Sequence, residues 1–95
     1  MRLITRKAVE ALFVGSRYKN SNTEVRDKAM YLHGHKIAWI DLNNQLWISH
    51  CGYTTNTTKE RLNGLPGVNI RQRNYQWYLN GEEWNFCPKC LGKVL

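Results

Sequence analysis

The stretch from residue 30 to residue 49, MYLHGHKIAWIDLNNQLWIS, decides the fold class because it predicts two β-hairpins in succession. The first hairpin turns at His33-Gly34 and the second at Asn43-Asn44. Both pairs contain residues that tolerate left-handed backbone geometry, which tight two-residue turns require. The apolar residues that flank each pair are therefore expected to form paired antiparallel strands.

The second hairpin determines which side chains share a face of the sheet. With a two-residue turn, Trp39 is expected opposite Ile48, and Ile40 opposite Trp47. Because side chains alternate along a strand, Trp47 and Ile40 then lie on the face opposite Trp39. The pair Trp47 and Ile40 marks either a second packed layer or an exposed site for a partner.

The last third of the chain is again typical of strands. Val68–Gln72 and Tyr75–Leu79 are expected to pair. The Asn-Gly dipeptide at residues 80–81 is the strongest turn signal in the chain, and it places Trp84 opposite Trp77. The alternation puts the apolar side chains of this segment on one core face and its polar side chains on the other.

Two helices are predicted outside these strands. The first covers Thr5–Val14, where apolar residues recur at helical spacing and Thr5 can act as N-cap. The second covers Thr58–Asn63 and follows the capping-box pattern, with Thr57 as N-cap and Glu60 reaching back. Lys59 and Arg61 of this second helix are expected to lie on the surface.

The order of helix, strands, helix and strands predicts an α+β fold on a mostly antiparallel sheet. The length of 95 residues corresponds to one domain. We expect residues 1–86 to form this domain and residues 87–95 to form a short cysteine-containing tail. The composition, 42% hydrophobic, excludes intrinsic disorder, and no apolar run is long enough for a membrane span or a signal peptide. A cytoplasmic protein is therefore expected.

The charge favours acidic partners. Lysine and arginine number 14 against 7 aspartate and glutamate residues, which gives a net charge of +7. Such a balance favours DNA, RNA or an acidic protein as a partner. Two groups of side chains could make the contact. One is the outer face of the last strands, with Arg71, Arg73 and Tyr78, and the other is a basic zone around the first helix, with Arg6, Lys7, Arg17 and Lys19.

The cysteines suggest a metal site. Three cysteines in a chain without a secretion signal argue against a disulfide framework. Cys87 and Cys90 form a CxxC pair, which supplies half of a tetrahedral Zn²⁺ site. Cys51 is the best third ligand and His50 the fourth, and in the alternative the pair consists of free thiols on the tail.

The sequence offers little for catalysis. Paired carboxylates at suitable spacing, a glycine-rich phosphate loop and a nucleophile elbow are all missing from the sequence. We therefore expect a protein that binds a partner and is not an enzyme.

Five runs of the sequence stand out, the most specific of them Asn56–Val68 and the others Thr5–Glu10, Asn22–Arg26, Leu32–Gly34 and Trp77–Gly81. Together they resemble a group of short proteins encoded by tailed bacteriophages. The resemblance implies a small phage product made in the cytoplasm of an infected bacterium. With the charge, it predicts a non-catalytic accessory protein that binds nucleic acid through a basic surface bearing aromatic side chains. The alternative is a protein that binds a host protein and inhibits or redirects it.

Overall fold

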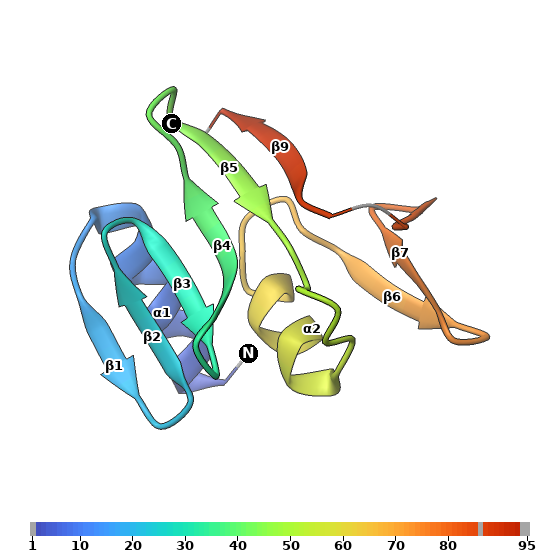
Figure 1. Ribbon diagram of the computed structural model, residues 1–95, viewed down its shortest axis with the longest axis horizontal. Helices are drawn as coiled ribbons and strands as arrows, with labels where there is room; N and C mark the ends of the chain where they lie inside the picture. Colours follow the sequence, from blue (N-terminus) through green and yellow to red (C-terminus); the bar gives the residue numbers. More distant parts are fainter. Residues whose placement is uncertain (1, 86, 94–95) are drawn as a thin grey trace.

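The computed structural model describes residues 2–85 and 87–93, and within them the chain forms an α+β fold, as predicted (Figure 1). A six-stranded antiparallel sheet has the strand order β1-β2-β3-β4-β5-β9, and a three-stranded sheet has the order β6-β7-β8. The elements are α1 (Leu3–Val14), β1 (Tyr18–Asn20), β2 (Thr23–Arg26), β3 (Ala29–Leu32), β4 (His35–Ile40), β5 (Gln45–Ile48), α2 (Asn56–Asn63), β6 (Ile70–Arg73), β7 (Gln76–Leu79), β8 (Glu82–Glu83) and β9 (Lys89–Lys93).

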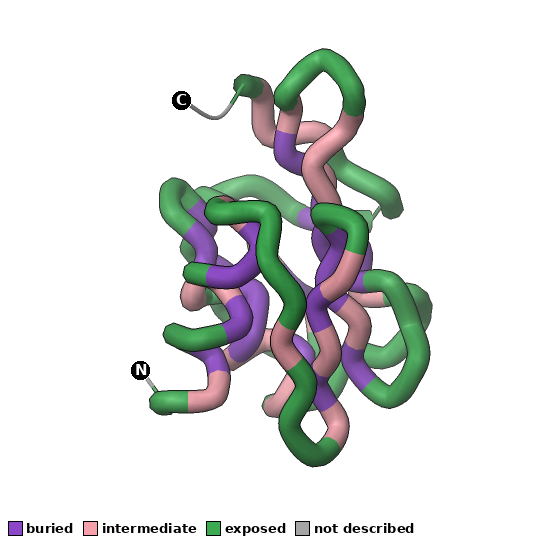
Figure 2. Tube along the Cα trace, turned by 90° about the vertical axis from the view of Figure 1, so that its left-hand side faces the viewer, coloured by how far each residue is buried: buried purple, intermediate pink, exposed green. Residues whose placement is uncertain are grey.

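Two of the predicted turns are confirmed. His33 and Gly34 both have positive φ and join β3 to β4, with Leu32 opposite His35. The Asn-Gly turn at residues 80–81 has the same geometry, as type I′ hairpin turns require. Because of these tight turns, the two strands that each turn connects pair directly in the sheet. In Figure 2 the hairpin turns are exposed, whereas the buried residues lie in the middle of the molecule.

The expected register of the β4–β5 hairpin is wrong by one residue. Trp39 lies opposite Trp47, and Ile40 lies opposite Leu46. A one-residue shift moves side chains to the other face of a sheet. Trp47 and Ile40 therefore do not share a face: Ile40 packs against the core, and Trp47 stands beside Trp39.

Asp41 explains this register. Its Oδ1 atom accepts hydrogen bonds from the amides of Asn43 at 2.8 Å and Gln45 at 2.9 Å. This aspartate turn makes a three-residue loop, with Asn44 in the left-handed conformation at φ 61°. The side chain of Asp41 thus replaces the two-residue turn that the Asn-Asn pair suggested.

The inner face of the six-stranded sheet carries the core. Val25, Met30, Ala38 and Ile48 are successive cross-strand partners and are all almost fully buried. The helix α1 packs on these strands and lies behind β2 and β3 in Figure 1. Burial of such side chains is the main favourable term in folding. The core also includes buried residues of the smaller sheet, namely Ile70, Trp77, Leu79 and Trp84.

The expected tail from residue 87 needs correction. Residues 89–93 form β9, which pairs antiparallel with β5 and completes the six-stranded sheet. Trp47 lies opposite Cys90 in this pairing, and Leu46 lies opposite Gly92. Backbone pairing with β5 orders this segment, although it contains few apolar residues.

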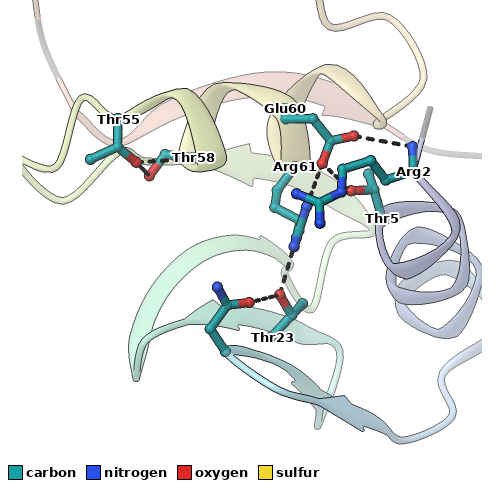
Figure 3. Close-up of polar contacts among 8 residues, drawn as sticks. Arg2, Thr5, Thr23, Thr55, Thr58, Glu60 and Arg61 are labelled. Atoms are coloured by element: carbon teal, nitrogen blue, oxygen red, sulfur yellow. Dashed lines mark hydrogen bonds and ion pairs between the residues drawn. The ribbon is translucent and has the colours of Figure 1, made fainter.

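Arg61 is buried, contrary to the expectation that it lies on the surface. Only 2% of the residue is exposed. Its Nε atom donates to Thr23 Oγ1 at 3.0 Å, and its Nη1 atom donates to Thr5 Oγ1 at 2.9 Å and to the carboxylate of Glu60 (Figure 3). One guanidinium group therefore connects α2 to β2 and α1.

The helix caps also differ from the expectation. Thr5 is not an N-cap: α1 begins at Leu3, and the buried Thr5 hydroxyl donates to Glu60. The N-cap of α2 is Thr55, whose Oγ1 atom accepts from the amide of Thr58 at 3.2 Å. Glu60 therefore serves contacts between the two helices and not a capping box.

We predict that Arg61→Ala lowers the free energy of unfolding by about 3 kcal/mol, because it removes the guanidinium that donates to the Glu60 carboxylate and to two buried hydroxyls. Lys59→Ala on the same helix is the control, and it should change stability by less than about 0.5 kcal/mol. Urea denaturation followed by tryptophan fluorescence measures both variants. Equal effects of the two substitutions would contradict a central role for Arg61.

Candidate nucleic-acid interface

The face of the six-stranded sheet opposite the helices, here named the outer face, carries a row of side chains across five strands. Arg26, Ala29, Trp39, Trp47 and Cys90 are successive cross-strand partners from β2 to β9. Partners that lie directly opposite each other point to the same side of a sheet. Arg26, Trp39 and Trp47 are partly exposed, whereas Ala29 is buried beneath its neighbours.

A second row runs parallel to the first on the outer face. Lys19, Glu24, Tyr31 and Lys36 are successive partners from β1 to β4. On β4 a β-bulge lies between Lys36 of the second row and Trp39 of the first row. Because of this bulge, both Ile37 and Ala38 point into the core. The outer face therefore carries both cationic and aromatic side chains.

The aromatic and cationic side chains of the outer face contact one another. The rings of Trp39 and Trp47 are parallel within 1°, with centroids 6.1 Å apart. Arg26 Cζ lies 4.4 Å from the centroid of the Tyr31 ring, and Lys36 Nζ lies 4.9 Å from that of Trp39. Cations above aromatic rings are attracted by the negative charge of the ring face. The contacts hold flat rings and positive charges together on one surface.

Asp41 orients Trp47 within this surface. Its Oδ2 atom accepts a hydrogen bond from Trp47 Nε1 at 2.8 Å. The amide of Gln45 and the indole of Trp47 lower the pKa of Asp41, because both bonds favour the charged carboxylate. The residue that sets the hairpin register thus also fixes an aromatic side chain of the outer face.

The outer face has an excess of positive charge. Of the described residues, Lys19, Arg26 and Lys36 stand on it, against two carboxylates, Glu24 and the Asp41 that bonds Trp47. Glu24 forms an ion pair of 3.5 Å with Arg26. An exposed pair of this kind is weak, so Arg26 remains able to contact a phosphate.

The structure places the residues predicted for nucleic-acid binding on separate surfaces. Arg71 lies opposite Tyr78 on the exposed face of the β6–β7 hairpin, and Arg73 follows on the same face. This hairpin lies at the opposite end of the molecule from β1 (Figure 1). The basic zone is also divided.

Of the basic zone, Lys19 belongs to the outer face. Arg6 is exposed on α1. Lys7 and Arg17 line one shallow hollow beside Glu10. The zone therefore does not form a single cationic surface.

The predicted ligands of a zinc ion are not brought together. The Cys51 thiol donates to the carbonyl of Lys36 at 3.0 Å, and the Cys90 thiol donates to Gln45 Oε1 at 3.2 Å. The His50 ring packs edge-on against two tryptophans, and Cys87 is exposed. Within residues 2–85 and 87–93, no three histidine, cysteine, aspartate or glutamate side chains are grouped as metal ligands. The arrangement gives the zinc hypothesis no support.

Sequence reasoning missed four residues of the outer face: Arg26, Tyr31, Lys36 and Trp39. The alternation in Thr23–Arg26 carried a signal, since its second and fourth residues are charged. The position of Trp39 depended on the hairpin register, which only the Asp41 side chain determines.

We predict that the protein loses stability as the pH falls below about 6.5. Burial lowers the pKa of His50, so the unfolded chain, with its ordinary pKa, binds the proton more readily than the folded chain. Asp41 and Glu60 also have lowered pKa values, but as carboxylates they act at lower pH. Thermal denaturation at several pH values should show a slope that His50→Gln flattens and that His33→Gln, at an exposed turn, does not. A slope unchanged in His50→Gln would refute this cause.

Within residues 2–85 and 87–93, no helix is long and apolar enough to cross a membrane.

Residues 1–92 match a family model described as Kyanoviridae Gp96 protein. No curated protein and no solved structure matches the chain. The match covers nearly the whole chain and confirms the resemblance to a group of phage proteins. The chain therefore belongs to the Kyanoviridae Gp96 protein family of bacteriophages.

Proposed function

We propose that this phage protein is a non-catalytic accessory factor that binds single-stranded nucleic acid on its outer face. The observation that carries the proposal is the parallel pair Trp39 and Trp47, flanked by Arg26 and Lys36. Partly exposed aromatic rings on a sheet provide planes on which unpaired bases stack. Neighbouring cations can contact the phosphates that connect those bases.

A single strand fits this surface better than a duplex. Bases within a duplex are stacked on each other, so their faces cannot reach Trp39 or Trp47. The net charge of +7 favours either form of nucleic acid, but the aromatic rings can stack only with unpaired bases. DNA and RNA both have such bases. We expect the protein to act in the cytoplasm of the infected bacterium.

The outer face is favoured over the β6–β7 hairpin. The hairpin offers Arg71, Arg73 and two exposed or partly exposed aromatic side chains, Tyr78 on its face and Tyr75 at its turn. Arg71 and Arg73 are exposed, and Tyr78 is partly exposed. The outer face combines more rings and more cations across adjacent strands of the larger sheet. Substitutions of arginine or lysine on the two surfaces therefore have different expected effects on nucleic-acid binding.

We predict that Trp39→Leu weakens binding of a single-stranded oligonucleotide about tenfold, because it removes one stacking plane and keeps an apolar side chain in place. Tyr75→Leu is the matched control, since Tyr75 is fully exposed at the β6–β7 turn, away from the outer face. Fluorescence anisotropy with a labelled strand measures the affinity, and the complementary duplex should bind more weakly. Equal affinity of Trp39→Leu and Tyr75→Leu would refute stacking on the outer face.

We also predict that Lys36→Gln and Arg26→Gln each reduce the salt dependence of binding, by about 0.7 in the slope of log affinity against log salt. Each substitution removes one phosphate contact and the release of its counterion. Arg71→Gln and Arg73→Gln should leave the slope unchanged. If only these two reduce the slope, the β6–β7 hairpin is the binding surface.

The salt dependence of partner binding distinguishes the alternative partner, a host protein. A protein interface built on Trp39 and Trp47 would be lost in Trp39→Leu but would depend little on salt. Failure of the wild-type protein to bind any single strand at low salt would reject nucleic acid as the partner.

A further inference from the structure

A cavity of about 270 Å³ lies where the β3–β4 turn meets the segment after β5. It collects all three histidines of the chain, since His33, His35 and His50 line it. His35 pairs with Leu32 of the inner face, whereas Lys36, directly after it, stands on the outer face, so the cavity lies on the other side of the sheet from the proposed binding surface, at the start of β4. The cavity itself has no part in the contacts described for the outer face.

The walls of this cavity are flat and apolar. The rings of His35 and Tyr53 lie 4.4 Å apart with an angle of 30° between their planes. The side chains of Leu32 and Ile37 line the cavity from the core and are almost fully buried. Apolar cavities with a few polar groups are typical of sites for small organic ligands. A planar ring fits such walls better than a hydrated ion does.

The polar groups at the cavity can pair with the edge of such a ring. His50 Nδ1 accepts a hydrogen bond from the amide of Gly52 at 3.0 Å, so the proton of the neutral ring is on Nε2. Burial lowers the pKa of His50 and keeps this ring neutral at pH 7. Thr57 also lines the cavity, and its hydroxyl can donate or accept.

We propose that this cavity receives a single nucleobase. Bases that leave the stack commonly stack on tyrosine or histidine rings and are read along their hydrogen-bonding edges. The inference rests on the proposed function for the source of the base, an oligonucleotide on the outer face. The cavity itself can be tested with free mononucleotides, which need no outer face.

The test is a titration of the protein with the common nucleoside monophosphates. Binding is monitored through the ring proton signals of the three histidines in NMR spectra. We expect at least one of these nucleotides to shift the signals of His35 and His50 in a saturable way. Ribose 5-phosphate, which lacks a base, should not shift them. Equal shifts with ribose 5-phosphate would overturn the assignment, because the cavity would then recognise phosphate.

Variants separate the cavity from the outer face. Tyr53→Ala should weaken mononucleotide binding at least tenfold, since it removes half of the ring wall, whereas Tyr75→Ala is the matched control and should bind normally. Trp39→Leu should also bind mononucleotides normally while losing oligonucleotide affinity. If no mononucleotide shifts the histidine signals but wild-type protein still binds oligonucleotides, the cavity proposal fails and the proposed function stands.

Discussion

The buried guanidinium of Arg61 is the interaction on which the arrangement of the two helices depends. Removing a charge from water is costly unless it is paired and hydrogen-bonded. Arg61 meets this requirement only when Thr5, Thr23 and Glu60 are all in place. The end of α2 lies very close to α1, because a Cβ atom at Gly64 would overlap the methyl group of Thr5. This position at the end of α2 therefore needs glycine. Because these contacts hold both helices on the inner face, the outer face remains open.

Local signals in the sequence predicted much of the fold. The Asn-Gly turn and the pairing of Trp77 with Trp84 depend on residues close in the chain, and the structure confirms them. Arg61 could not be placed in this way. Its partners Thr5 and Thr23 lie far away in the sequence, and a basic residue on a short helix is usually solvated. Burial of a charge becomes visible only when the elements are assembled.

The candidate interface shows how one side chain can decide which residues share a surface. The sequence predicted that Trp47 marks either a second packed layer or an exposed site for a partner, but with the wrong neighbour. Turn propensity favoured Asn43-Asn44, whereas Asp41 stabilises a longer loop through its carboxylate. A shift of one residue brings Trp47 beside Trp39 and removes Ile40 to the core. The positions of Arg26 and Lys36 relative to these rings then follow from strand pairing, which sequence patterns alone do not determine.

The pairing of β9 with β5 has a consequence for the order in which the chain is made. β5 emerges from the ribosome well before β9, so its open edge has no partner for that time. Unpaired strand edges recruit other chains and promote aggregation. Contacts between segments distant in the sequence also form slowly, because a long loop must close first. We therefore expect the edge of β5 to stay open to pairing with other chains until β9 has been made.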